Sequence, residues 1–232
     1  MLECQEMLSK RAEEIPTLYL RREDEMYIDQ TLQQFLDDLS SSQPTPGGGS
    51  ASALSGAMGA ALASMVCRLT VDKDEYAGVR EEIAALLQDT EDLRHRFQQL
   101  MQDDIEAYGK LSESFKMPRE TKEEREDRSS AIQERLVRAA LVPLEMAEAA
   151  ADLMQACLRI SEIGNTKVLS DIATGAMLAS SAGAGAAWMV RINLQSLKDL
   201  ERVTILGERL SNALDRITEI SQQVTTIVGE RT

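Results

Sequence analysis

The carboxylate of Asp104 occupies an unusual position for a charged group. It follows Phe97 by seven residues and Leu100 by four, which places it on the apolar stripe of a predicted helix. A carboxylate that faces a core must be paired, hydrogen-bonded or functional, because burial of an isolated charge costs several kcal/mol. The spacing leaves two interpretations open: an ion pair with an Arg from another helix, or a general acid and base with a pKa altered by burial.

A glycine-rich loop is the second candidate for chemistry. Residues 44–50 read Pro-Thr-Pro-Gly-Gly-Gly-Ser and run directly into a segment rich in Ala, Ser and Gly. Backbone N–H groups at a helix start bind anions or polar ligand groups, and glycines allow close approach. The loop lacks the Gly-Lys-Ser/Thr of a P-loop. A plain turn with a helix cap explains Gly47, Gly48, Gly49 and Ser50 equally well.

Other polar residues allow simpler interpretations. Ser170 and Asp171 precede a second small-residue segment, where both types serve as N-caps. Asp103 and Glu106 lie nearer the edge of the stripe that holds Asp104, as expected for a solvated helix face. His95 is the single histidine and falls off the stripe, which disfavours Ser-His and Cys-His catalysis.

The cysteines indicate neither a metal centre nor a disulfide framework. Cys4, Cys67 and Cys157 are widely spaced and form no CxxC or Cys/His pattern. The first residues, MLECQEMLSKRAEE, lack the apolar stretch of a secretion signal. We therefore expect no metal site and a cytoplasmic location.

Composition favours an all-α protein that binds neither nucleic acid nor membranes. The 232 residues carry 39 acidic and 25 basic side chains, a net charge of −14, which disfavours polyanionic partners. Aromatic residues make up only 3% of the chain, whereas strands favour them. Residues 172–190 carry no charge and approach the length of a membrane span, but their Ala, Gly and Ser content predicts a tightly packed buried helix.

Apolar periodicity predicts one multihelical domain over residues 27–232, preceded by an N-terminal extension over residues 1–26. A short amphipathic helix ends near residue 39, and the Pro/Gly loop follows it. Thr121 and Glu124 form a predicted capping box at the start of one long helix. That helix is predicted over residues 121–160. The other predicted helices cover residues 51–69, 74–115 and 197–228, and a small-residue helix begins near residue 170.

Short motifs occur in order along the chain, and together they resemble one family. They are Pro44 to Ser50, Met65 to Thr70, Asp104 to Tyr108, Pro118 with Arg128 and Gln133, Val142 to Leu144, Gly164-Asn165, Ser170-Asp171 and Ile192 to Leu194. The set resembles the cyclodeaminase/cyclohydrolase family. That family includes the C-terminal domain of formiminotransferase-cyclodeaminase and stand-alone bacterial methenyltetrahydrofolate cyclohydrolases.

The resemblance implies an all-α, multihelical bundle that forms a homodimer, with a tetrahydrofolate substrate near the subunit interface and no separate cofactor. It implies hydrolysis of 5,10-methenyltetrahydrofolate to 10-formyltetrahydrofolate. One alternative is formiminotetrahydrofolate cyclodeamination, which releases ammonia and gives the methenyl compound. A third interpretation is a helical dimer that binds folate or serves as a scaffold without catalysis.

The resemblance also assigns roles to residues. Asp104 is expected to act as general acid and base, with Asp171 and Asn165 orienting the pterin or the reacting water. Gly47 to Ser50 and Asn193 are expected to bind substrate. Arg119 and Arg128 are candidates for the glutamate tail, whose carboxylates need cations.

Two departures from the family pattern bear on activity. Family members often carry an Asp where this chain has Gln102, and many carry a polar residue where it has Met189. Both departures keep the non-catalytic interpretation open.

Overall fold

The computed structural model describes residues 27–231, and every regular element in this range is helical. The elements are η1 (Tyr27–Asp29), α2 (Leu32–Leu39), α3 (Gly48–Val71), η2 (Asp74–Val79), α4 (Arg80–Phe115), α5 (Lys122–Ile163), η3 (Thr166–Val168), α6 (Leu169–Gln195) and α7 (Leu200–Arg231). The all-α prediction is confirmed. The predicted extension, residues 1–26, lies outside the described residues.

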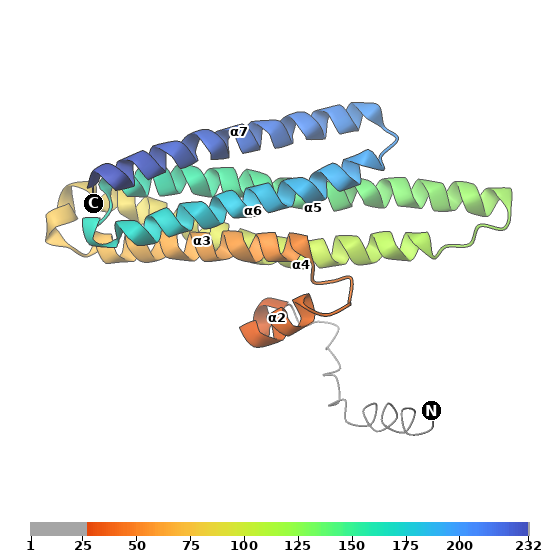
Figure 1. Ribbon diagram of the computed structural model, residues 1–232, viewed down its shortest axis with the longest axis horizontal. Helices are drawn as coiled ribbons and strands as arrows, with labels where there is room; N and C mark the ends of the chain where they lie inside the picture. Colours follow the sequence, from red (N-terminus) through yellow and green to blue (C-terminus); the bar gives the residue numbers. More distant parts are fainter. Residues whose placement is uncertain (1–26, 232) are drawn as a thin grey trace, which may run out of the picture.

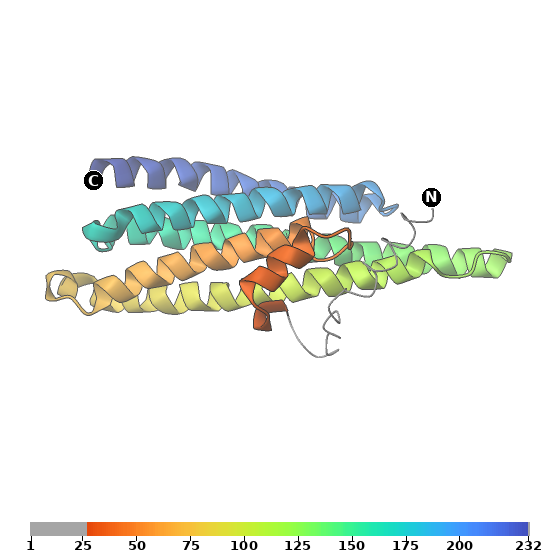
Figure 2. The same cartoon turned by 60° about the horizontal axis from the view of Figure 1, so that its bottom comes forward.

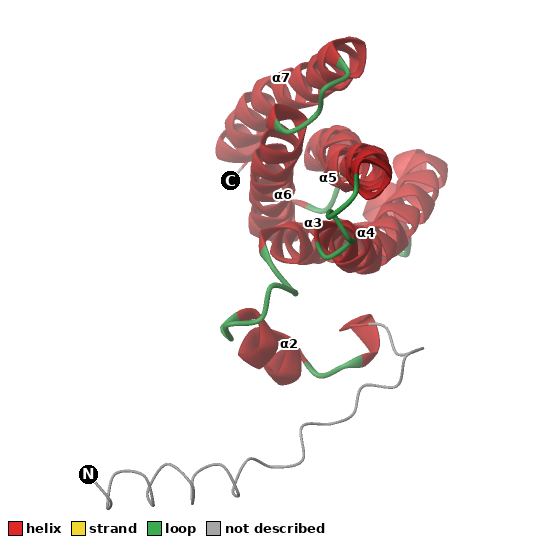
Figure 3. Ribbon diagram, turned by 90° about the vertical axis from the view of Figure 1, so that its right-hand side faces the viewer, coloured by secondary structure: helices red, strands yellow, loops and turns green. Residues whose placement is uncertain are grey.

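Four antiparallel helices, α3, α4, α5 and α6, form an elongated bundle, and α7 packs against α5 and α6 (Figures 1 and 3). The α4–α5 hairpin extends beyond the ends of the other helices (Figure 1). Helix α2 lies outside the bundle, across the α3 and α4 side (Figure 2). The loop from α2 leads into the start of α3, which therefore stands beside the middle of α4.

Small residues let α3 pack in the interior. A Cβ atom on Gly56 would lie 2.4 Å from the Phe97 ring, and one on Gly59 would lie 2.8 Å from the carbonyl oxygen of Gly175 in α6. Contacts this close, with the Phe97 ring at Gly56 and with the α6 backbone at Gly59, exclude any side chain larger than hydrogen at these positions. The predicted burial of the first small-residue helix is confirmed, since more than half of α3 is buried. Helix α6 buries ten of its 27 residues along one face and leaves Met177, Trp188 and Ile192 exposed.

The capping box at the start of α5 is also confirmed. The Thr121 hydroxyl accepts a hydrogen bond from the Glu124 N–H at 3.1 Å, and the Glu124 carboxylate accepts one from the Thr121 N–H at 3.0 Å. The box fixes where α5 begins after the turn that contains Pro118. The helix predicted from residue 74 begins instead at Arg80, because residues 74–79 form the 3₁₀ segment η2, in which Tyr76 leaves helical geometry.

Within residues 27–231, α3 is the one helix long and apolar enough to cross a membrane by length and composition. Half of its most apolar window is buried inside the bundle. A core helix of a bundle can have the same length and apolar composition. The packing of α3 against α4 and α6 accounts for its apolar character. Residues 172–190, whose length approaches that of a membrane span, are not apolar enough to cross one.

Candidate active site at the start of α3

The start of α3 borders a cavity of about 200 Å³. The loop before α3 forms one wall, and α4, α5 and α6 form the others. Its lining residues are Pro44, Thr45, Gly47, Gly48, Gly49, Asp104, Ala107, Tyr108, Leu111, Ala139, Met189 and Asn193. Five residues predicted from the sequence motifs therefore meet at one place: the three glycines, Asp104 and Asn193.

Asp104 is partly buried and forms no ion pair with any described residue. Its Oδ2 atom accepts a hydrogen bond from the Ser50 hydroxyl at 3.2 Å, and the Ser50 backbone N–H also interacts with the carboxylate. Of the two interpretations left open by the spacing, the ion pair with an Arg is therefore absent from the described chain. Asp104 is hydrogen-bonded and faces the cavity.

Burial raises the pKa of the Asp104 carboxyl above its ordinary value of 3.8. The cause is desolvation, and the Ser50 hydroxyl and backbone N–H oppose it by stabilising the charged form. A carboxyl group with a raised pKa exchanges protons closer to neutral pH. That property suits a general acid and base.

The three glycines of the loop differ in what surrounds them. A Cβ atom on Gly49 would lie 2.3 Å from Asp104 Oδ1 and 2.5 Å from Oδ2, distances that no side chain tolerates. A Cβ on Gly48 would meet the Met189 methyl at 3.6 Å, an ordinary contact, and one on Gly47 would meet the Pro44 carbonyl at the same distance. Close approach to Asp104 therefore requires glycine at position 49 alone.

Helix α6 supplies the opposite wall through Met189 and Asn193. The Asn193 side-chain NH2 donates hydrogen bonds to the carbonyl oxygens of Ala139 at 2.8 Å and Met189 at 2.9 Å. These bonds fix the orientation of the amide at the cavity. Met189 makes this wall apolar at the position where the family resemblance implies a polar group.

The other departure, Gln102, lies outside this cavity lining. Its amide donates to Glu106 at 3.3 Å, and its Oε1 atom is buried without a hydrogen-bond partner among the described residues. Asp103 forms an ion pair with Arg138 at 3.2 Å. Asp103 is partly buried and Glu106 is exposed, as expected for the edge of the helix stripe.

Arg119 and Arg128 lie at the tip of the α4–α5 hairpin. Arg128 donates a hydrogen bond to the Phe115 carbonyl at 3.2 Å, and its Nε atom is buried without a hydrogen-bond partner in the described chain. Phe115 follows Asp104 by eleven residues on α4, which corresponds to about 16 Å along the helix axis. The two arginines therefore lie outside the cavity, beyond it along α4 in the direction of the hairpin tip.

Asn165 and Asp171 lie at the opposite end of the bundle. The Asn165 side chain donates to the Leu69 carbonyl at 2.9 Å and accepts from the Lys167 N–H at 3.0 Å, and its backbone N–H donates to the Thr70 hydroxyl. Asp171 starts α6, which reaches the cavity 22 residues later at Asn193, about 33 Å along the helix. Within one chain, neither residue contacts Asp104.

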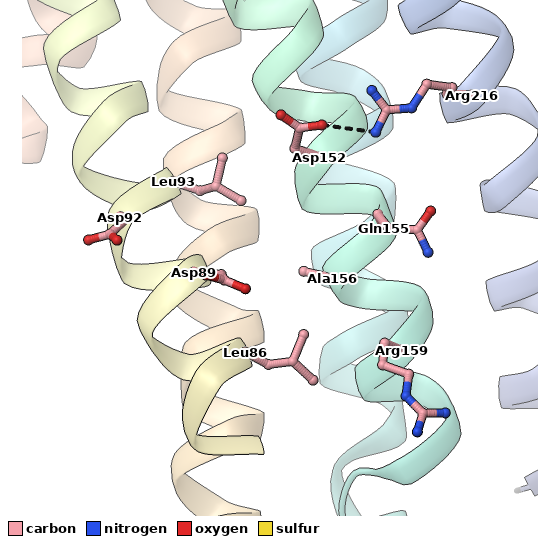
Figure 4. Close-up of a pocket in the computed structure, with 9 residues that line it drawn as sticks. All are labelled: Leu86, Asp89, Asp92, Leu93, Asp152, Gln155, Ala156, Arg159 and Arg216. Carbon is pink, nitrogen blue, oxygen red and sulfur yellow. Dashed lines mark hydrogen bonds and ion pairs between the residues drawn. The ribbon is translucent and has the colours of Figure 1, made fainter. Parts of the chain in front are cut away.

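A larger cavity of about 540 Å³ lies between α4 and α5, with Arg216 reaching in from α7 (Figure 4). Arg216 forms an ion pair with Asp152 at 2.9 Å, and Arg159 forms one with Glu162 at 2.7 Å and another with Glu82. Both arginines of its lining are thus already paired. None of the residues predicted from the motifs lines it.

Four residues of the quoted motifs line the cavity without having been assigned to the site: Pro44, Thr45, Ala107 and Tyr108. Tyr108 is the one with an ionisable side chain. It follows Asp104 by four residues and is 44% exposed. The helical spacing is the signal that predicts a shared face. Tyr108 therefore lines the cavity on the same helix face as Asp104, one turn further along α4.

Comparison with known proteins identifies the family. A model described as formiminotransferase-cyclodeaminase matches residues 31–212. The methenyltetrahydrofolate cyclohydrolase of Methylorubrum extorquens is 39% identical over 170 residues, which are 73% of this chain and 82% of that protein. The formimidoyltransferase-cyclodeaminase of Mus musculus is 32% identical over 89% of this chain, which spans 38% of that longer protein.

A solved structure shows the same architecture. The formiminotetrahydrofolate cyclodeaminase of Thermotoga maritima has a TM-score of 0.80 and 27% identity, covering 87% of this chain and 96% of that one. The family resemblance predicted from the motifs is confirmed by the matching family model and these relatives. The chain belongs to the formiminotransferase-cyclodeaminase family.

Proposed function

We propose that this chain hydrolyses 5,10-methenyltetrahydrofolate to 10-formyltetrahydrofolate in the cavity beside Asp104. The observation that carries the proposal is Asp104 itself, a partly buried carboxylate without a cation partner in the described chain that faces a cavity of family-motif residues. The similarity to the Methylorubrum cyclohydrolase supports hydrolysis, because the match covers 82% of that protein.

The geometry suits proton transfer at a carbon between two nitrogens. The Asp104 carboxylate accepts a proton as water attacks the methenyl carbon, which is flanked by N5 and N10. The tetrahedral adduct then loses its hydroxyl proton, the bond from carbon to N5 breaks, and N5 takes the proton from Asp104. One proton is released overall, and the carbon keeps its oxidation state. Neither hydrolysis nor cyclodeamination therefore calls for a redox cofactor.

The negative charge of Asp104 also stabilises the cationic methenyl group. A carboxylate that is only partly solvated interacts more strongly with a nearby cation than one in water. The Met189 side chain lines the same cavity and makes part of its wall apolar. Substrate binding is therefore expected to favour the charged form of Asp104.

The glutamate tail of the substrate runs in this proposal from the cavity along α4 towards Arg128. Tyr108 and Phe115, which are 44% and 53% exposed, provide aromatic surface between the two. The Arg128 guanidinium, which donates to the Phe115 carbonyl, stands at the end of this path, and guanidinium groups bind carboxylates well. Arg119 lies at the same tip and is exposed.

We also propose a homodimer formed across the α3–α6 side of the bundle. Met177, Trp188 and Ile192 of α6 are each more than half exposed, and Met58 of α3 adds to the apolar surface. Exposed apolar side chains that gather on one side of a protein mark interfaces. A two-fold axis perpendicular to α6 would place the Asp171 end of one copy beside the Asp104 end of its partner.

Such a dimer would have composite sites, in which Asp104 of one copy and Asp171 of its partner face the same substrate. This arrangement can be tested by mixing two inactive variants. Asp104→Asn and Asp171→Asn homodimers each carry the defect in both sites, whereas a heterodimer regains one intact site. Refolding the two together at equal amounts is expected to restore about a quarter of wild-type activity if subunits pair at random. No recovery from mixed, dimeric protein would confine Asp171 to a structural role.

Cyclodeamination is the second candidate function. The near-complete coverage of the Thermotoga cyclodeaminase favours it, because this chain contains the whole of that architecture. In that reaction N10 attacks the formimino carbon and ammonia leaves. The formimino group reacts in its protonated, cationic form. The same carboxylate accepts the N10 proton and returns it to the departing nitrogen, which leaves as ammonia while the carbon becomes the methenyl cation.

Absorbance of 5,10-methenyltetrahydrofolate distinguishes the proposals. Purified protein is assayed once from that compound and once from 5-formiminotetrahydrofolate, with a buffer blank. Accelerated loss of the methenyl signal without action on the formimino compound supports the cyclohydrolase. Appearance of the signal with ammonia release supports the cyclodeaminase. Folded protein that is inactive in both assays but binds folate supports the non-catalytic alternative.

A further inference from the structure

We propose that Ser50 is a positioning residue that orients the Asp104 carboxylate and stabilises its charged form, rather than part of the substrate-binding wall. The inference rests on the proposed function and deepens it, because it concerns the carboxylate to which that function assigns proton transfer. The family resemblance placed Ser50 among the substrate-binding residues. The contacts of its side chain point instead to Asp104.

Ser50 is fully buried and is absent from the cavity lining. Its hydroxyl donates to Asp104 Oδ2 at 3.2 Å, and its backbone N–H interacts with the same carboxylate. Gly49, the preceding residue, brings the α3 backbone so close to Asp104 that a Cβ would lie within 2.5 Å of both oxygens. The first turn of α3 thus holds the carboxylate from one side and leaves its other side to the cavity.

No charged side chain among the described residues contacts the Asp104 carboxylate from the elements packed around it. On α4, Asp103 is paired with Arg138 and Glu106 is bonded to Gln102. Alanine, methionine and asparagine face the cavity from α5 and α6, at positions 139, 189 and 193. Tyr108 is the one other ionisable residue of the cavity lining. Burial and the two Ser50 donors are the causes that set the pKa of Asp104 among the described residues.

Removal of the Ser50 hydroxyl leaves the effect of burial less opposed. A hydrogen bond to a charged group typically stabilises it enough to move a pKa by about one unit. In Ser50→Ala, the pKa of Asp104 is therefore expected to rise by about one further unit. A substrate-wall residue would instead change KM and leave the titration of Asp104 where it is.

The direct test follows the Asp104 carboxyl carbon by NMR in protein labelled with 13C-aspartate, with Asp104→Asn to assign the signal. Ser50→Ala, Ser50→Cys and wild type are titrated in parallel. Ser52→Ala is the matched control, because Ser52 is a buried serine of the same turn whose hydroxyl donates to the Gly48 carbonyl. The expected order of the Asp104 pKa is Ser50→Ala above Ser50→Cys, above wild type and Ser52→Ala.

Kinetics provide a second readout. In Ser50→Ala, the acidic limb of the pH profile of kcat/KM is expected to shift to higher pH by the same amount as the NMR titration of Asp104. The value of kcat is expected to fall, while KM changes little. An Asp104 titration equal in Ser50→Ala and wild type would overturn the proposal, as would a raised KM with unchanged kcat. A shifted titration in protein inactive towards both folates would support the Ser50 contact and overturn the proposed function.

Discussion

The two ends of the bundle use polar residues in opposite ways. At the start of α3, Asp104 keeps one face towards a cavity and takes its only side-chain hydrogen bond in the described chain from Ser50. At the far end, Asn165 is 2% exposed, and its amide and backbone N–H are bonded to Leu69, Lys167 and Thr70. Both residues belong to the motifs of the family resemblance.

The difference shows that the role of a motif residue depends on whether its polar atoms are already hydrogen-bonded within the chain or remain available to a ligand. The hydrogen bonds of Asn165 join the end of α5 to the end of α3, so within one chain they stabilise the fold. Asp104 has an altered pKa and an open side, which is what proton transfer needs. Substitutions at the two ends should therefore separate activity from stability.

The largest effect is expected at Asp104. Asp104→Asn keeps the side-chain shape and the acceptor for Ser50 but removes the ability to exchange a proton. We expect kcat to fall by about 100-fold or more, measured by methenyltetrahydrofolate hydrolysis. Circular dichroism should show an unchanged helical spectrum, and activity near that of wild type would remove Asp104 from the mechanism.

Asn165→Ala should show the reverse pattern. The change leaves the Leu69 carbonyl and the Lys167 N–H without their partner, so we expect the free energy of unfolding to fall by about 2 kcal/mol. Thermal unfolding monitored by circular dichroism measures it. If Asn165 acts only within its own chain, kcat per folded molecule should stay within a few-fold of wild type. A collapse of kcat in stable protein would instead place Asn165 in a composite site.

The glycine loop offers a matched pair of substitutions. Gly49→Ala forces a Cβ into the Asp104 carboxylate, whereas Gly48→Ala adds an ordinary contact with Met189. We expect Gly49→Ala to lower kcat/KM by at least about tenfold, since displacement of a catalytic group by an ångström costs that much or more. Gly48→Ala should lose clearly less. Equal losses would show that the loop as a whole, rather than its contact with Asp104, matters.

Arg128→Ala should affect binding more than turnover. Loss of a guanidinium contact to a carboxylate is expected to raise KM about tenfold with kcat nearly unchanged. The assay compares a folate substrate carrying its glutamate with a truncated pterin analogue. Arg125→Ala is the control, because Arg125 lies on the same turn of α5 and is held by the Arg119 and Glu120 carbonyls. A similar KM increase for the truncated analogue would contradict the assigned tail path.

The smallest effect concerns stability and pH. Because the pKa of Asp104 is raised in the folded chain, the folded state binds the proton more tightly than the unfolded state. Its contribution to stability is complete below the ordinary value of 3.8 and is lost as pH rises through the raised pKa. The Tm of Asp104→Asn should therefore exceed that of wild type at neutral pH, and the difference should vanish at low pH. A constant difference across this range would contradict the raised pKa.

Much of the fold could be predicted from local patterns. Apolar spacing and the Thr121–Glu124 capping box predict helices whose ends agree with the structure to within a few residues. Apolar spacing predicts the start of α4 six residues too early, because the 3₁₀ segment η2 carries similar residues without regular helical geometry. The exposure of each helix face follows from the same periodicity.

The candidate site was predicted only in part. The motifs identified Asp104, the glycines and Asn193, which the structure brings together. The Ser50 contact with Asp104 joins residues 54 positions apart, so it depends on how α3 and α4 are aligned along each other. The family resemblance grouped Asn165 and Asp171 with Asp104, whereas the turn between α5 and α6 places both at the end of the bundle away from it.

The seam between α3 and α6 bears on the order of folding. Ser55 of α3 donates a hydrogen bond to the Leu178 carbonyl of α6 across 123 positions, whereas α4 and α5 are joined by a short turn. Contacts between segments far apart in sequence cost more loop-closure entropy to form. We therefore expect the α4–α5 hairpin to form first and the contacts between α3 and α6 to form late. The cavity needs α3 and α6 together. Folate binding would then report completed folding, and helical intermediates would bind no ligand.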